Sequence, residues 1–164
     1  MIKLIIFDRD DTLNIDDGFT YKLSDLRLVN GAKRVCEFVL DQGFSYAIAT
    51  NQSGIGEGYY QEDDMRRFNR ALFDKLGLDY SDDNVAFCPH PREMIARCGC
   101  RKPSPYLLLD LCVRFGVSPS EAVFIGDSET DAQAAERAGC HFIYVDPKIG
   151  HNSTIEKIDS LSGE

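Results

Sequence analysis

The chain alternates between short apolar runs and longer amphipathic segments, and this alternation constrains its fold more than any other feature. The apolar runs predict strands at residues 2–7, 44–49, 85–87, 122–125 and 142–145. Helical patterns cover residues 31–42, 62–76, 104–116 and 130–138, and a glycine stands near the end of each. Strands that alternate with helices form βαβ units with right-handed crossovers. We therefore predict an α/β fold, a single Rossmann-like domain over residues 1–164 with a mainly parallel five-stranded sheet covered by helices on both faces.

The predicted helices carry their apolar residues on one side. In the segment 62–76 these residues are Met65, Phe68, Leu72, Phe73 and Leu76. Leu40 and Leu109 are assigned to the apolar sides of their own helices, and Cys36, Cys112 and Cys140 are interpreted as small core residues. Residues 147–164 carry little pattern, so that both a short packed helix and a loose tail are compatible with the sequence.

The charge balance and the apolar runs exclude several functions. Acidic residues outnumber basic ones by 27 to 18, giving a net charge of −9, which argues against a nucleic-acid or anionic-membrane partner. No apolar run approaches the roughly 20 residues of a bilayer span, and the first one is too short for a signal peptide. We expect a cytoplasmic monomer whose six cysteines are thiols or metal ligands rather than disulfides.

Four polar clusters follow predicted strands or precede a predicted helix. They are Asp8-Arg9-Asp10-Asp11-Thr12, Thr50-Asn51, Arg101-Lys102-Pro103 and Gly126-Asp127-Ser128-Glu129-Thr130-Asp131. An aspartate after a strand is commonly only a helix N-cap or a turn former. Four clusters on one sheet nevertheless favour a shared site, because ligands of such folds bind beyond the carboxyl ends of the strands.

The residue types in these clusters indicate phosphoryl transfer. Asp8, Asp10 and Asp127 would repel one another in a poorly solvated cleft unless a cation joined them, and an all-oxygen site suits Mg²⁺. The Thr50 hydroxyl and the Lys102 ammonium are suited to contact phosphoryl oxygens. Positioning and charge stabilisation of this kind are what phosphoryl transfer needs.

A second metal site is predicted at residues 88–100. Cys88, His90, Cys98 and Cys100 supply three thiolates and one imidazole within thirteen residues, a donor set typical of structural zinc. A site closed by four protein ligands has no open position for catalysis. We expect the zinc to order this loop and so to position Arg101 and Lys102, which follow it directly.

The four polar clusters resemble the four motifs of the haloacid dehalogenase superfamily of phosphatases, over residues 1 to about 145. The resemblance implies that Asp8 is the nucleophile that forms an aspartyl-phosphate, and that Asp10 is the general acid and then the base. It implies a Mg²⁺ ion held by Asp8, the backbone carbonyl of Asp10 and Asp127. Thr50 and Lys102 would hold the phosphoryl oxygens, and Asp131 would orient Lys102 or metal-bound waters.

Family members often carry an inserted cap domain, for which this chain has no room in either gap between motifs. The zinc loop before Arg101-Lys102-Pro103 narrows the resemblance to two subgroups, the heptose bisphosphate phosphatases and the histidinol-phosphate phosphatases. The first is favoured and implies a small phosphorylated substrate, a sugar bisphosphate, bound by Asp16, Asp17, Gly18, Phe19, Asn51, Gln52, Ser53 and Arg101. Histidinol phosphate is the alternative substrate, and a non-catalytic binding module is the alternative from another class.

Two positions depart from the family pattern. Asp11 stands where the family usually has glycine, and we expect it to turn away from the site and shape the backbone bend. Ser128 stands where the heptose subgroup tends to have lysine.

Overall fold

The computed structural model describes residues 1–94 and 96–163. Five parallel strands form one sheet: β1 (Leu4–Phe7), β2 (Ser45–Asn51), β3 (Val85–Cys88), β4 (Ala122–Gly126) and β5 (His141–Tyr144). Their order is β3-β2-β1-β4-β5, with β1 at the centre. After β1, the chain adds β2 and β3 on one side of it and then crosses to add β4 and β5 on the other side. The strand order therefore reverses beside β1. The predicted parallel α/β sheet is confirmed.

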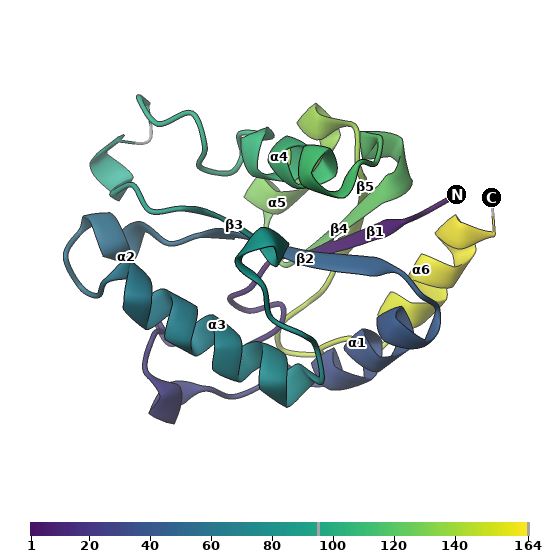
Figure 1. Ribbon diagram of the computed structural model, residues 1–164, viewed down its shortest axis with the longest axis horizontal. Coiled ribbons are helices and arrows are strands. Elements are labelled where there is room, and N and C mark those ends of the chain that lie inside the picture. Colours follow the sequence, from purple (N-terminus) through teal and green to yellow (C-terminus); the bar gives the residue numbers. More distant parts are fainter. Residues whose placement is uncertain (95, 164) are drawn as a thin grey trace.

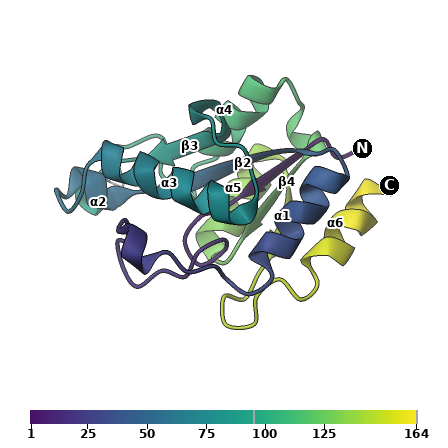
Figure 2. The same cartoon turned by 60° about the horizontal axis from the view of Figure 1, so that its bottom comes forward.

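Helices cover both faces of the sheet, as Figures 1 and 2 show. On one face lie α1 (Ala32–Asp41), α3 (Glu62–Leu76) and α6 (Thr154–Ser162), and on the other lie α4 (Tyr106–Phe115) and α5 (Glu129–Ala138). A short helix, α2 (Ser53–Gly56), follows β2 directly. Short 3₁₀ turns at Leu23–Asp25, Asp82–Asn84, Arg92–Met94 and Pro119–Glu121 complete the connections.

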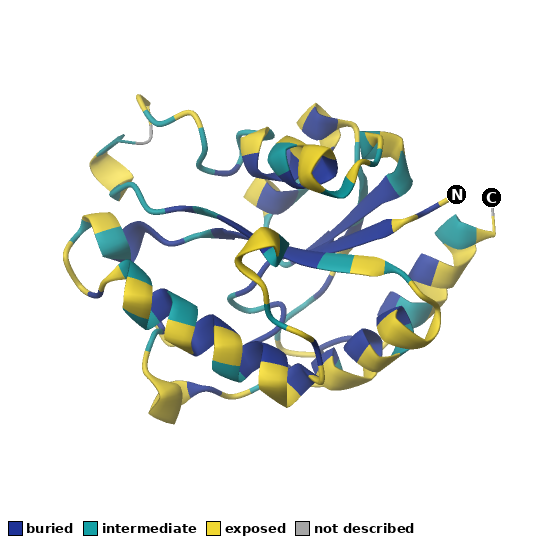
Figure 3. Ribbon diagram, viewed as in Figure 1, coloured by how far each residue is buried: buried dark blue, intermediate teal, exposed yellow. Residues whose placement is uncertain are grey.

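The central strands are buried on both sides (Figure 3) because their residues alternate between two cores. Ile5 and Phe7 of β1 face the core under α1, α3 and α6. Leu4 and Ile6 face the core under α4 and α5. This alternation follows from the two-residue period of a strand, and it holds the carboxyl end of β1 rigidly in the middle of the molecule.

The structure corrects part of the predicted helix faces. Leu40 and Leu109 are 41% and 37% exposed rather than buried. On α4 the buried residues are Leu107, Leu108, Leu111 and Cys112. Three consecutive leucines leave the rotation of a helix about its axis undetermined by sequence pattern, and here contacts with β3 and α5 decide it.

The two segments with the least pattern form helices. The four residues of α2 are too few for a periodicity to be read. Residues 154–162 form α6, whose Ile158 lies in the core beside α1 and β5. Of the two states compatible with the sequence, the tail adopts the packed helix.

The two gaps between motifs in which members of the resembled family often carry a cap are filled by elements of this fold and its loops. The gap from β1 to β2 holds a loop, one 3₁₀ turn and α1, and the gap from β2 to Lys102 holds α2, α3, β3, two 3₁₀ turns and the 88–100 loop. Among the described residues, no helix combines the length and the apolar character that a membrane span requires.

Candidate functional site

A cavity of about 240 Å³ lies at the carboxyl ends of β1, β2 and β4. Residues from all four polar clusters line it, although they are separated along the chain by up to about 120 residues. Its lining residues are Asp8, Asp10, Asp11, Asp16, Thr50, Asn51, Lys102, Asp127, Ser128, Thr130 and Asp131. The convergence follows from the parallel sheet, in which strand exits share one edge.

Lys102 is the buried cation of this cavity. Its Nζ atom donates to Asp8 Oδ1 at 2.7 Å and to the Ala49 carbonyl at 3.0 Å, and it lies 2.7 Å from Asp131 Oδ1. Burial alone would lower the pKa of Lys102, but the carboxylates of Asp8 and Asp131 outweigh burial and raise it. Lys102 is therefore charged at neutral pH and neutralises part of the carboxylate cluster.

Asp131 holds Lys102 from the first turn of α5. Its Oδ1 faces Lys102, while its Oδ2 accepts a hydrogen bond from the backbone N–H of Asp127 at 3.3 Å. A Cβ atom at Gly126 would lie 2.5 Å from Asp131 Oδ2, so only glycine lets the carboxylate approach the end of β4 this closely. The backbone N–H of Asp131 is capped by the Ser128 hydroxyl at 3.2 Å.

The remaining carboxylates are crowded. Burial raises the pKa of Asp8 well above its ordinary value; Lys102 opposes this shift, and Asp131 and Asp127 add to it. Burial also raises the pKa of Asp127. Carboxylate oxygens of Asp8, Asp127 and Asp131 all lie within 4.8 Å of one another. Carboxylates this close cannot all be ionised without a further cation, and their oxygen donors suit a hard divalent ion.

Asp10 is held by four N–H groups. Its Oδ1 accepts hydrogen bonds from Arg9 Nε (3.0 Å), Arg9 Nη2 (2.9 Å) and Asn14 Nδ2 (3.0 Å). Its Oδ2 accepts one, from Gln52 Nε2 at 3.1 Å. The carboxylate therefore has a fixed orientation, with Oδ2 as its less occupied oxygen.

Arg9 is completely buried. Besides Asp10, its guanidinium donates to the Thr20 carbonyl at 2.8 Å and to Asn69 Oδ1 at 3.2 Å, and it stacks 4.6 Å from the centre of the Phe68 ring. A buried arginine needs this number of partners to offset the loss of water. It ties the β1 exit to α3 and to the loop that follows Asp16.

The end of β2 is tied to Lys102. The Asn51 side chain accepts from the Lys102 backbone N–H at 3.0 Å and donates to the Lys102 carbonyl at 3.3 Å. Thr50 is buried, and its Oγ1 accepts from Gln52 Nε2 at 2.8 Å. Gln52 and Ser53 are themselves buried and are not among the lining residues of the cavity, so the structure separates them from Asn51.

The loop after the first cluster lines a second cavity, of about 480 Å³. Asp16 lines the first cavity, whereas Asp17, Gly18 and Phe19 line the second together with Lys22 and Tyr59, among others. Figure 2 shows this loop (residues 14–28, dark purple) beside the carboxyl ends of the strands.

Asp11 shapes the start of this loop. It adopts a left-handed backbone with φ of 63°, the region that favours glycine, and its Oδ1 accepts from the Asp16 backbone N–H at 2.9 Å. The side chain also lines the first cavity. The expectation that Asp11 shapes the bend is confirmed, but the side chain does not turn away from the site.

Arg101, like Gln52 and Ser53, is a predicted substrate residue that lines neither cavity. Its Nη1 atom is buried without a hydrogen-bond partner among the described residues. A buried, unpartnered guanidinium nitrogen is costly, and an anionic ligand would satisfy it.

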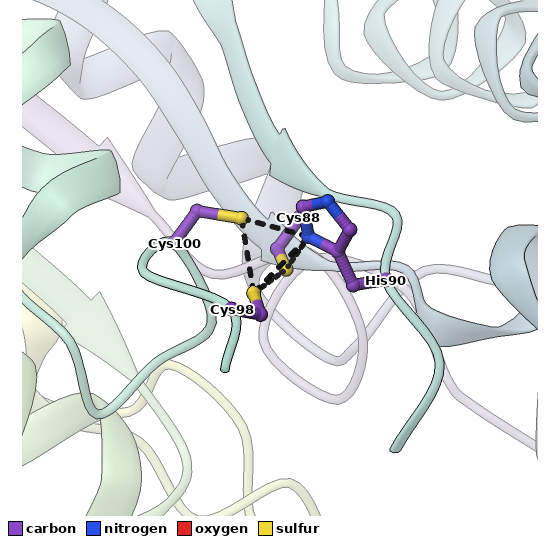
Figure 4. A group of neighbouring side chains, drawn as sticks. All are labelled: Cys88, His90, Cys98 and Cys100. Carbon is purple, nitrogen blue, oxygen red and sulfur yellow. Dashed lines mark hydrogen bonds between the residues drawn. The ribbon is translucent and has the colours of Figure 1, made fainter. Parts of the chain in front are cut away.

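The four predicted zinc ligands converge (Figure 4). His90 Nδ1 lies 3.1–3.3 Å from the sulfur atoms of Cys88, Cys98 and Cys100, and Cys98 Sγ lies 3.2 Å from Cys88 Sγ and 3.3 Å from Cys100 Sγ. Burial opposes ionisation of Cys98, but hydrogen bonds from its neighbours outweigh burial and lower its pKa to about 6. A thiolate among soft donors suits zinc. Residue 95 of this loop lies outside the described residues.

The 88–100 loop is attached to α2. The Gly56 backbone N–H donates to the Pro89 carbonyl at 2.8 Å, and a Cβ atom at Gly56 would lie 2.4 Å from Pro91 Cδ. At its other end, the Ser104 hydroxyl donates to the Gly99 carbonyl at 2.7 Å. The loop thus connects the end of β2 to the segment that carries Lys102.

Sequence reasoning missed several residues that support the site. Arg9, Asn14 and Tyr60 hold Asp10 directly or through Gln52. His151 Nε2 donates to the Thr12 carbonyl at 2.7 Å, and His151 Nδ1 lies 3.0 Å from the Thr154 hydroxyl oxygen. The one available signal was Arg9 itself, a long cationic side chain between two aspartates at a buried strand end.

Comparisons with known proteins give consistent matches. Residues 14–139 match the model of the haloacid dehalogenase-like hydrolases. D-glycero-beta-D-manno-heptose-1,7-bisphosphate 7-phosphatase of Haemophilus ducreyi is 32% identical over 143 residues, covering 84% of this chain and 79% of the relative. D-glycero-alpha-D-manno-heptose-1,7-bisphosphate 7-phosphatase of Campylobacter jejuni is 34% identical over 137 residues, covering 83% of this chain and 77% of the relative.

A solved structure gives the same match. D,D-heptose 1.7-bisphosphate phosphatase from B. bronchiseptica, complexed with magnesium and phosphate, superposes with a TM-score of 0.80 at 29% identity. The match covers 90% of this chain and 84% of that one.

Proposed function

The chain belongs to the haloacid dehalogenase-like hydrolases and is a phosphatase, and from this premise we propose that it removes the 7-phosphate of D-glycero-D-manno-heptose 1,7-bisphosphate. The observation that carries the proposal is the cluster of buried Asp8, Lys102 and Asp131 with half-buried Asp127 at the carboxyl ends of the strands. Relatives named for this reaction span most of the chain.

Asp8 is the nucleophile in this proposal. One of its carboxylate oxygens attacks the phosphorus atom, forming an aspartyl-phosphate while the bond to the sugar oxygen breaks. The contacts of Lys102 with Asp8 and Asp131 support the assignment, since they orient the Asp8 carboxylate and supply positive charge beside the attacked phosphoryl group. The Thr50 hydroxyl and the Asn51 side chain, at the end of β2, line the same cavity and are suited to bind phosphoryl oxygens.

Asp10 is the general acid and then the general base. It first gives its proton to the departing sugar oxygen, and it then takes a proton from the water that attacks the aspartyl-phosphate and releases phosphate. Three N–H groups already occupy Oδ1. The hydrogen-bond pattern therefore supports Oδ2 as the oxygen that exchanges the proton.

The crowded carboxylates support a Mg²⁺ ion held by Asp8, Asp127 and the backbone carbonyl of Asp10. When bound, Mg²⁺ neutralises charge on the transferring phosphoryl group. The convergence of Cys88, His90, Cys98 and Cys100 supports structural zinc, which would hold the loop between α2 and Lys102. Thiol ligands of this kind stay reduced in the cytoplasm, where we propose that the enzyme acts as a monomer.

Two features suit the remainder of the substrate. The cavity lined by Asp17, Gly18 and Phe19 is large enough for a sugar and offers aromatic and hydroxyl-binding groups. The unpartnered Nη1 atom of Arg101 supports this residue as the partner of the second, non-reacting phosphate, because a planar guanidinium pairs two phosphate oxygens.

The test is a comparison of kcat/KM for both anomers of heptose 1,7-bisphosphate and for histidinol phosphate, with Mg²⁺ present. We expect kcat/KM for the preferred heptose anomer to exceed kcat/KM for histidinol phosphate by about 100-fold or more, which corresponds to about 2.7 kcal/mol. A preference of that size for histidinol phosphate would overturn the substrate assignment.

The nucleophile is tested with Asp8→Asn, which should abolish hydrolysis, against Asp63→Asn, whose exposed carboxylate lies on α3 and whose activity should match the wild type. Full activity in Asp8→Asn would refute the nucleophile assignment. A folded wild type without activity on any monoester would favour a non-catalytic binding module.

A further inference from the structure

Tyr60 closes a chain of side-chain hydrogen bonds that ends on Asp10. Its hydroxyl donates to Gln52 Oε1. The Nε2 atom of Gln52 donates in turn to Asp10 Oδ2 at 3.1 Å and to Thr50 Oγ1 at 2.8 Å. Gln52 is 2% exposed, and both the nitrogen and the oxygen of its side-chain amide have hydrogen-bond partners. One glutamine thus links two residues assigned to the reaction to a tyrosine that lines neither cavity.

The orientation of the Gln52 amide decides whether this link exists. An amide has two N–H donors on one side and one acceptor oxygen on the other. With the observed orientation, both donors face the oxygens of Asp10 and Thr50. A half-turn of the amide would instead direct Oε1 at the Asp10 carboxylate, which repels it, and would take the amide donors away from both Asp10 Oδ2 and Thr50 Oγ1.

The Tyr60 hydroxyl selects the observed orientation because it is a donor aimed at Oε1. Burial raises the pKa of Tyr60 to about 12, so the hydroxyl keeps its proton at any working pH. Against the flipped amide, the Tyr60 oxygen could only accept from an N–H₂ group, and the hydroxyl proton would lose Oε1 as its acceptor.

The Tyr60 ring is itself fixed. It stacks on Tyr21 with ring centres 4.8 Å apart and an angle of 17° between the planes. It also lies against Gly54 of α2, where a Cβ atom would be 2.3 Å from Tyr60 Cε1. The glycine of the Thr50–Gly54 segment therefore makes room for the ring, and the ring in turn fixes the position of the hydroxyl oxygen beside Gln52 Oε1.

We propose that Tyr60 is a positioning residue that acts through Gln52 to hold Asp10 and Thr50 in the geometry required for phosphoryl transfer. The proposal rests on the proposed function of Asp10. It assigns Gln52 an internal role, in contrast to the substrate contact expected from the resemblance.

The test compares Tyr60→Phe with Tyr80→Phe. Each substitution removes one hydroxyl that donates to a single side chain, Gln52 or Asp82, and each keeps the ring and its aromatic neighbour. Loss of one hydrogen bond should lower kcat of Tyr60→Phe about three- to tenfold and leave KM within about twofold. Tyr80→Phe, whose hydroxyl faces solvent outside both cavities, should keep both constants.

A double-mutant cycle separates action through Gln52 from a general loss of rigidity. Gln52→Ala should lower kcat at least as much as Tyr60→Phe, and adding Tyr60→Phe to Gln52→Ala should change kcat by less than about twofold. If the two substitutions lower kcat by factors that multiply in the double variant, the proposed link is refuted.

A readout independent of activity is the side-chain amide of Gln52 in ¹H–¹⁵N spectra, identified by its absence in Gln52→Ala. Its protons should exchange slowly with water in the wild type and in Tyr80→Phe, and faster in Tyr60→Phe. Unchanged exchange in Tyr60→Phe would refute the positioning role. A wild type without phosphatase activity would refute the proposed function, whereas an active wild type matched in kcat by Tyr60→Phe would refute only the role of Tyr60.

Discussion

Replacement of Asp131 by asparagine tests how the buried Lys102 is held. The Asp131 carboxylate uses both oxygens, Oδ1 facing Lys102 Nζ at 2.7 Å and Oδ2 accepting from the Asp127 backbone N–H at 3.3 Å. Asparagine has the same shape but a single acceptor oxygen. One of the two donors must therefore face an N–H₂ group.

The magnitude follows from two opposing effects. A buried donor without a partner costs about 1–3 kcal/mol, and complete disruption of a buried ion pair costs about 3–5 kcal/mol. Lys102 keeps its contact with Asp8, and the loss of the Asp131 charge relieves the repulsion that contributes to the raised pKa of Asp8. We expect a net destabilisation of about 2–3 kcal/mol, and a Tm lower by about 5–10 °C for a domain of this size.

The assay is urea unfolding of wild type, Asp131→Asn and Asp110→Asn at one Mg²⁺ concentration, together with kcat. Asp110 forms an exposed ion pair with Arg114 on α4, so its substitution should cost less than about 1 kcal/mol. The kcat of Asp131→Asn should fall by about tenfold or more, since a charged group aimed at the reacting centre loses its orientation. An unfolding free energy and kcat equal to those of Asp110→Asn would refute the reasoning.

Three further predictions follow from other contacts. Burial lowers the pKa of His151 below its ordinary 6.5, so the unfolded chain binds more protons than the folded one, and stability should fall as the pH drops below about 6.5. Urea midpoints measured from about pH 7 to about pH 5 should therefore fall less in His151→Asn than in the wild type. An equal dependence of the midpoint on pH in both proteins would contradict this. Cys98→Ser should lose the bound zinc and have a lower Tm, whereas Cys112→Ser should keep the metal, with zinc content measured by atomic absorption. A wild type purified without zinc would exclude the site. Gly126→Ala should destabilise the fold by about 1–3 kcal/mol, because its Cβ would lie 2.5 Å from Asp131 Oδ2; an unchanged unfolding free energy would show that Asp131 can move at no cost.

Local patterns predicted the elements that depend on neighbours along the chain. The helix over 62–76 has the expected bounds, because its apolar residues recur every three to four positions and Gly77 adopts the left-handed backbone that ends it. The cysteine and histidine residues predicted as zinc ligands converge as expected, since all four lie on one short loop. The alternation of strands and helices was sufficient to predict that the polar clusters share one edge of the sheet.

Only the tertiary structure decided how the site is supported. Arg9 and Asn69 are 60 residues apart, and His151 and Thr12 are 139 apart, yet each pair is joined by a hydrogen bond. A periodic pattern reports which side of an element is apolar, but it carries no information on which polar groups meet across the packed core. The rotation of α4, the amide orientation of Gln52 and the burial of Arg9 depend on that packing, because each is determined by partners that the folded chain alone brings within hydrogen-bonding or van der Waals distance.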